Sequence, residues 1–342
     1  MRIKKEVRKI VASVLAFLMV VSLIPVNSLM TKANAASKTT FEGGKTVEDG
    51  TWKGWTWNVF GSSTDVTKAF ATDTGNGGVT LEVTGDKGKI NGSASDQGLN
   101  TFLYELDKSY DFTITAQAKV DTLAANAQAA FGLTIRDNVG THGNTAKLTA
   151  DKNNFAFVGG YGNQAASGHG NAGYKTTALA HTRLGESPEV GGTYDLAIQK
   201  VGDSVKLYFN GEVAAECSAD DLITDNAMYV GLFAARNAKV TFNNVKLAYT
   251  QDSSSVKVTT NVTAPKKTTY CAGNTYEDVD LTGFKATVSV DGKEREITAS
   301  DCVVDMSNDP FAEVTEAGKL NLLYLGQTIE VPITVIKEVV SD

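Results

Sequence analysis

Apolar and polar residues alternate strictly along two stretches in the first half of the chain. Between Asp111 and Asp121, Phe, Ile, Ala, Ala and Val take every second position, and Thr, Thr, Gln and Lys stand between them. Between Asn126 and Asp137, Phe131, Leu133 and Ile135 follow the same rule. A period of two predicts β-strands with one apolar face and one face open to water or a ligand. Because only residues 122–126 join them, we expect the strands to be antiparallel neighbours in one sheet.

Shorter stretches of the same kind recur as far as Tyr249. They cover residues 79–83, 101–106, 155–158, 194–200, 205–209, 228–235 and 239–249. Asn210-Gly211 predicts a tight hairpin turn, because both central positions of such a turn favour positive φ. No helical pattern of ten residues occurs between Thr51 and Tyr249. Many short strands with Gly-rich turns favour a sandwich of two sheets over residues 51–250.

The C-terminal part of the chain predicts a second, smaller β-domain. Residues 251–256 are polar and Ser-rich, which is typical of a linker. Beyond them, residues 284–290, 294–297, 320–324 and 328–336 have strand patterns, and Asp291-Gly292 predicts another hairpin turn. We therefore expect a small sandwich over residues 257–340.

The N-terminus predicts export. A basic start is followed by an apolar run from Ile10 to Val26 and by Ala33-Asn34-Ala35, the small-x-small pattern of a signal peptidase site. This pattern predicts a signal peptide over residues 1–36 and a secreted or cell-surface protein, with an uncleaved membrane anchor as the alternative. Residues 37–50 are expected to be a flexible mature N-terminus. No second long apolar run occurs, so no membrane span is expected in the mature chain.

Charge and cysteine content limit the partners and the chemistry. The formal charge is −7; residues 1–36 contribute six Lys or Arg and one Glu, so the remainder carries −12. An acidic exported chain is a poor candidate for binding nucleic acid. Cys217, Cys271 and Cys302 show no C-x-x-C spacing. Export permits a disulfide between Cys271 and Cys302, although spacing alone does not fix the geometry of such a bond.

Several segments of residues 51–250 are similar to a known family. They are GKINGSASDQGLNTFLYEL (88–106), DFTITAQAKVD, AFGLTIRD, GGTYDLAIQK, VKLYFNGE and MYVGLFAARNAKVTFNNVKL. Together they resemble the concanavalin A-like jelly-roll modules of secreted bacterial polysaccharide-active proteins. The resemblance implies an all-β, two-sheet jelly-roll sandwich and leaves the ligand open.

A second resemblance concerns the C-terminal segment. Its motifs are Pro-x-Lys-x-x-Tyr-x-x-Gly at 265–273, Asp-Leu-Thr-Gly at 280–283, Asp-Gly at 291–292 and Gly-Lys…Tyr-x-Gly-Gln-Thr-Ile at 318–329. They resemble a bacterial immunoglobulin-like domain of the cell-surface type. The resemblance implies a small immunoglobulin-like β-sandwich that acts as a spacer or adhesion module without catalysis.

The carboxylates and histidines do not match the catalytic patterns expected for this shape. Retaining glycosidases of the jelly-roll type carry Glu-x-Asp-x-x-Glu on one strand, so that two carboxyl groups reach one glycosidic bond, and alginate lyases of this fold carry Gln-x-His. Neither motif occurs here. His142, His169 and His181 fall in stretches predicted to be loops. A lyase that uses His169 or His181 with Arg136 or Arg183 stays open as an alternative.

The Gly-rich segment Gly159–Gly173 is predicted to be a long loop. Its letters GHGNAG match a dinucleotide fingerprint, but no strand–turn–helix context surrounds them, so that interpretation is rejected. Long loops in compact β-domains often bind ligands.

A glycan site needs an aromatic platform and a few planar polar groups. The candidate ligand-binding residues are Trp55, Trp57, Tyr104, Gln117, Arg136, Tyr161, His169 and Arg183. Each has a plainer interpretation: the tryptophans could pack in the core, and Arg136 could pair with Asp137. Oxygen ligands at Asp73, Asn76 and Asp96 would suit a structural Ca²⁺.

Taken together, the sequence predicts a secreted, non-catalytic carbohydrate-binding protein in which a jelly-roll module binds a polysaccharide and an immunoglobulin-like spacer follows. The alternatives are a polysaccharide lyase or glycoside hydrolase acting in the jelly-roll groove, and a structural or adhesive surface protein.

Overall fold

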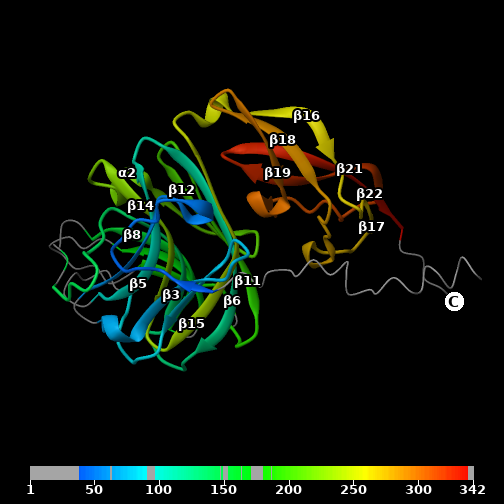
Figure 1. The fold of residues 1–342 in the computed structure, drawn as a ribbon. Helices are drawn as coiled ribbons and strands as arrows, with labels where there is room; N and C mark the ends of the chain where they lie inside the picture. Colours follow the sequence, from blue (N-terminus) through cyan, green and yellow to red (C-terminus); the bar gives the residue numbers. More distant parts are fainter. Residues whose placement is uncertain are drawn as a thin grey trace, which may run out of the picture. The chain divides into compact units, whose positions relative to one another are not determined.

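The computed structural model describes residues 38–61, 64–90, 97–146, 148, 153–162, 164–170, 180–185 and 187–337. The predicted signal peptide and Asp96 lie outside the described residues. The described chain is all-β: a jelly-roll sandwich of two large sheets is followed by a smaller sandwich (Figure 1). No helix in these ranges combines the length and the apolar character needed to cross a membrane.

The first large sheet has eight antiparallel strands. In spatial order they are β1 (Thr39–Thr40), β3 (Ala69–Asp73), β4 (Val79–Val83), β15 (Ala238–Thr250), β6 (Asp111–Leu123), β11 (Thr193–Val201), β12 (Ser204–Phe209) and β13 (Glu212–Ser218). The hairpin predicted at Asn210-Gly211 is confirmed: it joins β12 to β13, with φ of 49° and 84° at these two residues.

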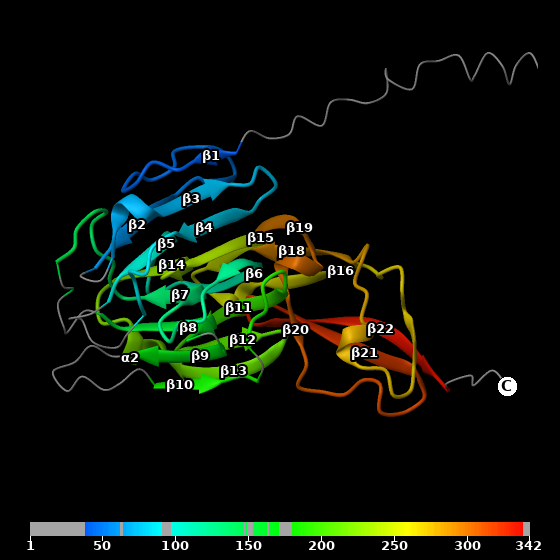
Figure 2. The same cartoon turned by 90° about the horizontal axis from the view of Figure 1, so that it is seen from below.

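The second large sheet has seven antiparallel strands. Their order is β10 (Ala180–Arg183), β9 (Gln164–Gly170), β8 (Phe155–Tyr161), β7 (Ala130–Arg136), β14 (Ala227–Ala235), β5 (Leu99–Asp107) and β2 (Trp55–Phe60), as Figure 2 shows. The predicted pairing of the two longest alternating stretches is therefore wrong. They are β6 and β7, which belong to different sheets, and the chain between them crosses from one layer to the other. Alternation specifies which face is apolar, but it does not specify the partner strand.

The main core lies between the two large sheets. Phe131, Leu133 and Ile135 of β7 meet Phe112 and Ile114 of β6 there, and all five side chains are fully buried. Full burial of one such side chain stabilises the fold by about 1.5–3 kcal/mol. The inward faces of both sheets are thus those that the sequence pattern predicts.

The outer face of the seven-stranded sheet is also largely covered. Every residue of β7 is buried, and a second apolar cluster lies on this face. Its fully buried aromatic members are Phe60, Phe155, Phe157 and Phe233. The face that the sequence predicts to be open is therefore open only in part.

Short helical turns connect the strands of both sandwiches. They are η2 (Gly50–Trp52), η3 (Val66–Lys68), α2 (Ala219–Leu222), η5 (Ser253–Ser255), η6 (Tyr276–Asp278) and η7 (Ala299–Asp301), of which only α2 is an α-helical turn.

The C-terminal sandwich consists of a three-stranded and a four-stranded sheet. The first is β16 (Lys257–Thr263), β18 (Lys285–Val290) and β19 (Lys293–Thr298); the second is β17 (Thr269–Cys271), β22 (Gln327–Ile336), β21 (Thr315–Tyr324) and β20 (Val303–Asp305). β17 and β22 are parallel, and the other pairs are antiparallel. Asp291-Gly292 forms the predicted turn between β18 and β19, with φ of 51° and 73°. The immunoglobulin-like assignment and the exact domain boundaries stay predictions.

The disulfide predicted between Cys271 and Cys302 is not formed, and Cys217, Cys271 and Cys302 are all free thiols. Cys271 lies in β17 and Cys302 directly precedes β20, and these are the opposite edge strands of the four-stranded sheet. Three strand spacings of ~4.8 Å separate such edges by about 14 Å. A disulfide requires Cα atoms within about 7 Å, so the sheet itself keeps the two thiols apart.

The predicted linker is packed against both sandwiches. Ser253 of η5 is 8% exposed, and its carbonyl accepts a hydrogen bond from Gln327 Nε2 at 2.9 Å. Thr250 Oγ1 donates to Asp291 Oδ1 at 2.6 Å, and Thr115 Oγ1 donates to Ser300 O at 2.7 Å. These contacts join the two sandwiches more closely than a polar linker implies.

Candidate functional site

Arg136 is a buried structural residue, contrary to its predicted role as a ligand-binding group. It ends β7 with no exposed surface. Its Nη2 donates to Gln97 Oε1 and to Asn153 Oδ1, the latter at 2.7 Å, and its guanidinium lies 5.1 Å from the centre of the Phe155 ring. Two segments distant in sequence thus cover Arg136, and no ligand could reach it without their displacement.

Asp137 is buried beside Arg136 but binds other groups. It accepts hydrogen bonds from the Asn154 backbone N–H at 2.9 Å and from Thr224 Oγ1 at 3.2 Å. Burial raises the pKa of Asp137 to about 6, although the nearby Arg136 charge acts in the opposite direction. Burial also lowers the pKa of Arg136 to about 10. Both shifts express the cost of holding charge away from water.

Trp55 and Trp57 pack in the core, so their predicted role as an open sugar platform is wrong. They are 6% and 7% exposed. Trp55 stacks on Phe102 with ring centres 5.2 Å apart, and Trp57 Nε1 donates to Asn100 Oδ1 at 2.7 Å. Both rings point inward because they share the parity of the core-facing positions of β2.

Tyr104 and Gln117, two further predicted site residues, belong to different sheets. Tyr104 is half-buried, and its hydroxyl is hydrogen-bonded to that of Tyr249 at 3.1 Å. Gln117 stands on β6, on the outer face of the eight-stranded sheet, and its Oε1 accepts from Asn244 Nδ2 at 3.2 Å. The predicted pair of Arg136 and Gln117 is therefore divided between opposite sheets of the sandwich.

Tyr161, His181 and Arg183 come together, and we call them the edge cluster. The Arg183 guanidinium lies over the Tyr161 ring, 5.2 Å from its centre, and Nη1 donates to the Tyr161 carbonyl. The ring centres of Tyr161 and His181 are also 5.2 Å apart, with planes at 76°. His181 and Arg183 are exposed and Tyr161 is half-buried, so this cluster faces water.

Strand register explains why the edge cluster forms. β8, β9 and β10 are the last three strands at one edge of the seven-stranded sheet. Arg183 is paired with Ala166 and His181 with Gly168, so small residues of β9 lie between the side chains of β8 and β10. Longer side chains at these two positions would fill the space across which the cluster closes.

The prediction of a long Gly-rich loop over residues 159–173 is wrong for most of that segment. Residues 159–161 end β8, and residues 164–170 form β9. His169 lies within β9 and His181 within β10, not in loops. His142 packs against Trp57 with ring centres 5.0 Å apart. Glycine in these strands permits close backbone approach, because a Cβ on Gly159 would lie 2.2 Å from Phe131 O.

The predicted calcium site stays a prediction. Asp73 Oδ1 accepts a hydrogen bond from the Gly75 backbone N–H at 2.7 Å, and Asp96 lies outside the described residues. Within the described ranges, no group of three or more His, Cys, Asp or Glu side chains is placed to hold a metal ion.

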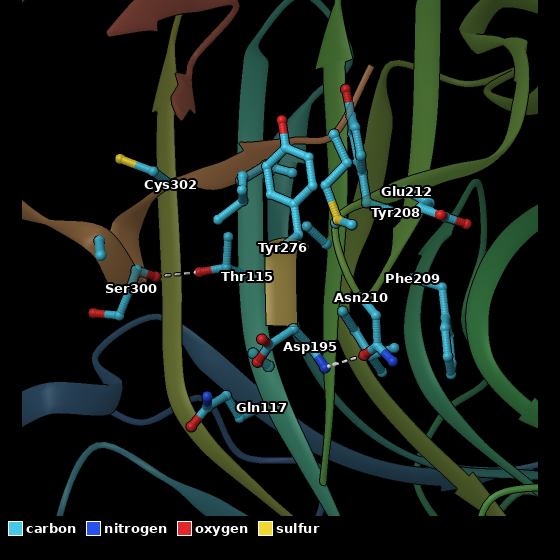
Figure 3. A pocket seen from close by; sticks show the side chains of 18 of the residues that line it. Thr115, Gln117, Asp195, Tyr208, Phe209, Asn210, Glu212, Tyr276, Ser300 and Cys302 are labelled. Carbon is cyan, nitrogen blue, oxygen red and sulfur yellow. Dashed lines mark hydrogen bonds between the residues drawn. The ribbon is translucent and has the colours of Figure 1, made fainter. Parts of the chain in front are cut away.

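A cleft of about 790 Å³ lies between the eight-stranded sheet and the C-terminal sandwich (Figure 3). Gln117, Asp195 and Asn210 contribute to it from the first sandwich, and Tyr276 and Ser300 from the second. Apart from Gln117, sequence reasoning missed these residues. The sequence shows the alternation along these strands, but nothing local indicates that Thr115 and Ser300, 185 residues apart, meet at this cleft.

Comparisons with known proteins give one sequence relative. No protein-family model matches the chain. The chain is 29% identical over 282 residues to a protein described as pectate lyase L from Thermoclostridium stercorarium. The match covers 82% of this chain and 21% of that protein, so the chain spans about a fifth of its relative.

Solved structures with a related arrangement are distant. A carbohydrate-binding module, CBM66, from Bacillus subtilis is 17% identical and covers 63% of this chain and 96% of that one, with a TM-score of 0.33. Lectin II from Ulex europaeus is 10% identical over 62% of this chain and 97% of that one, with a TM-score of 0.38. The alginate lyase AlgAT5 is 14% identical and covers 53% of this chain and 82% of that one, with a TM-score of 0.34.

Proposed function

We propose that this protein is a secreted, non-catalytic carbohydrate-binding protein whose edge cluster binds an acidic polysaccharide. The observation that carries the proposal is the exposed stack of Arg183 on Tyr161, with His181 at its side. A half-buried tyrosine ring can pack against the C–H face of a pyranose, and its position at a sheet edge leaves room for a long chain.

The chemistry of Arg183 suggests the class of ligand. A guanidinium is a planar fork that binds carboxylates through two parallel hydrogen bonds, and it does so best where an aromatic ring orients it. Uronate units carry such carboxylates. The sequence similarity to a segment of a pectate lyase supports a polyuronate such as pectate as the first ligand to test.

A polysaccharide lyase is the second candidate, because Tyr161, His181 and Arg183 are residue types that could perform β-elimination. In that reaction, a base removes the proton beside the uronate carboxylate, the C–O bond to the leaving sugar breaks, and an acid protonates the leaving oxygen. We favour binding over catalysis for this cluster. Arg183 is held by its hydrogen bond to the Tyr161 carbonyl and by its stack on the Tyr161 ring, an arrangement that suits it to bind a carboxylate. A general base must also be held within hydrogen-bond reach of its proton.

Calorimetry with polygalacturonate, together with ultraviolet detection of unsaturated products, tests both candidates on the full chain. We expect binding without product, and a large loss of affinity in Arg183→Ala and Tyr161→Ala. Lys293→Ala removes one exposed positive charge from the C-terminal sandwich and serves as the control. Unsaturated product that disappears in His181→Ala would establish the lyase. Absence of binding to any polysaccharide would favour the structural or adhesive alternative.

A further inference from the structure

The cleft between the two sandwiches has the size and the mixed lining of a ligand site. Its volume of about 790 Å³ lies within the ~300–1,000 Å³ range of small-molecule sites. It lies on the outer face of the eight-stranded sheet, whereas the edge cluster belongs to the seven-stranded sheet. The two sites are therefore built from different residues and can be tested separately.

The floor of the cleft presents fixed polar groups. Asp195 of β11 is the cross-strand neighbour of Gln117 of β6, so their side chains share one face. Asn244 Nδ2 holds the Gln117 amide at 3.2 Å, and the Asn210 side chain accepts from the Asp195 backbone N–H at 2.9 Å. The Asp195 carboxylate itself makes no hydrogen bond or ion pair with the described residues. Figure 3 shows Gln117, Asp195 and Asn210 on this side of the cleft.

The opposite wall holds an aromatic ring in one orientation. The Tyr276 hydroxyl shares its one proton between two carbonyl oxygens, those of Asp305 at 3.1 Å and Asn308 at 2.8 Å. Its ring and that of Phe311 form a T-shaped pair, with centres 5.7 Å apart and planes at 72°. The hydroxyl contacts hold the half-buried ring in one orientation at the cleft, where a sugar ring could stack on it.

Tyr208 also lines the cleft. The residue as a whole is 3% exposed, and its side chain packs with Ala197 and Val303. It therefore adds an aromatic side chain to the lining where the two sandwiches meet.

The charge of the lining selects the class of ligand. The lining residues include three carboxylates, Asp195, Glu212 and Glu277, and no Lys, Arg or His. Such a lining disfavours polyuronates and other anions, because like charges repel. Carboxylates accept two hydrogen bonds at once from neighbouring sugar hydroxyls.

We propose that this cleft binds a neutral oligosaccharide, with the Tyr276 ring as the stacking surface and Asp195 and Gln117 as hydrogen-bonding groups. Hydrogen bonds between the sandwiches, such as Thr115 Oγ1 to Ser300 O and Leu325 N–H to Thr113 Oγ1, keep the cleft open in one shape. A preformed site avoids the cost of ordering its walls on binding.

The test is calorimetry on the full chain with neutral oligosaccharides (cello-, xylo-, manno- and galacto-oligosaccharides), oligogalacturonate and chitosan oligosaccharides. We expect a neutral series to bind and Asp195→Ala to weaken it at least tenfold. Asp195 is exposed, so this variant should fold. Tyr276→Leu should also weaken binding at least tenfold, whereas Tyr276→Phe, which keeps the ring, should bind within about threefold of the unmodified chain.

Arg183→Ala separates this site from the edge cluster, because it should leave neutral binding unchanged. The proposal is overturned if no neutral series binds, or if Asp195→Ala and Tyr276→Leu bind as tightly as the unmodified chain. It is also overturned if oligogalacturonate or chitosan oligosaccharides bind more tightly than every neutral series and lose that binding in Asp195→Ala.

Discussion

Arg136 and Arg183 lie on the same face of the same seven-stranded sheet, in surroundings that differ completely. Arg136 ends β7 in the middle of the sheet, is fully buried, and has two side-chain amides and two phenylalanine rings around it. Arg183 ends the edge strand β10, is exposed, and lies over a single tyrosine ring. In the sequence both were candidates for a glycan site, and only Arg136 stood at the end of a predicted strand.

The difference shows that the residue type alone does not decide whether an arginine on a sheet face is structural or is accessible to a ligand. What decides it is whether other segments cover that part of the face. The segments that carry Gln97 and Asn153 cover the outer face of the sheet at Arg136. The guanidinium there donates hydrogen bonds to both side-chain amides. Its Nε and Nη2 have fixed hydrogen-bond partners, whereas the buried Nη1 has none. At the β10 edge, Arg183 keeps an exposed guanidinium, which is what a ligand needs.

Arg136→Ala should have the largest effect and tests the difference between the two arginines most directly. Loss of the guanidinium removes the hydrogen-bond donor of Gln97 Oε1 and Asn153 Oδ1 and opens a cavity between Phe60 and Phe155. We expect the free energy of unfolding to fall by about 3 kcal/mol or more. Urea unfolding of this variant and of Arg183→Ala measures the contrast, since Arg183→Ala should change stability by no more than about 0.5 kcal/mol. Equal effects of the two substitutions would contradict the distinction.

Arg183→Ala should weaken binding of polygalacturonate by about 1–3 kcal/mol, the usual cost of losing a charged hydrogen bond. Arg183→Lys should recover only part of this affinity, because an ammonium keeps the charge but not the planar fork. Calorimetric Kd values, accompanied by melting temperatures that do not move, would support the edge cluster as the site. An unchanged Kd in Arg183→Ala would exclude Arg183 from it.

The stability of the folded protein should also depend on pH through the buried Asp137, next to Arg136. The pKa of Asp137 is raised to about 6 in the folded protein, mainly by burial, against about 4 in the unfolded chain. Between these values the folded state binds more protons, so its stability should fall as pH rises from about 4 to 6, by at most about 1.4 kcal/mol per pH unit. Urea unfolding across this range should show a shallower fall in Asp137→Asn. An identical pH profile in the variant would argue against a raised pKa.

The smallest expected contrast concerns two threonines. Thr134 Oγ1 in β7 is buried and donates to Ala156 O at 2.9 Å, whereas Thr182 in β10 is exposed. Thr134→Val should lower the free energy of unfolding by about 1 kcal/mol, because a buried carbonyl loses its side-chain donor. Thr182→Val is the matched control, and we expect a change of less than about 0.5 kcal/mol there. A larger loss in the control would show that the β10 edge is more tightly packed than its exposure indicates.

The sequence by itself determined the fold class, the inward faces of the principal strands and two hairpin turns. Phe131, Leu133 and Ile135 point into the core, as their alternation predicts, and Asn210-Gly211 and Asp291-Gly292 form the predicted turns. These features are local. A strand face depends on a period of two, and a tight turn depends on the φ values that its own residues tolerate.

Only the tertiary structure decided which strands pair, which faces are covered and which candidate residues meet. β6 and β7 have the same pattern whether they share a sheet or face each other across the core. Gln97 and Asn153 cover Arg136 from 39 and 17 residues away in sequence, and Tyr161 meets Arg183 from 22 residues away. Side-chain burial and hydrogen bonding of this kind depend on partners that are distant along the chain, and hydrophobic periodicity carries no information about distant partners.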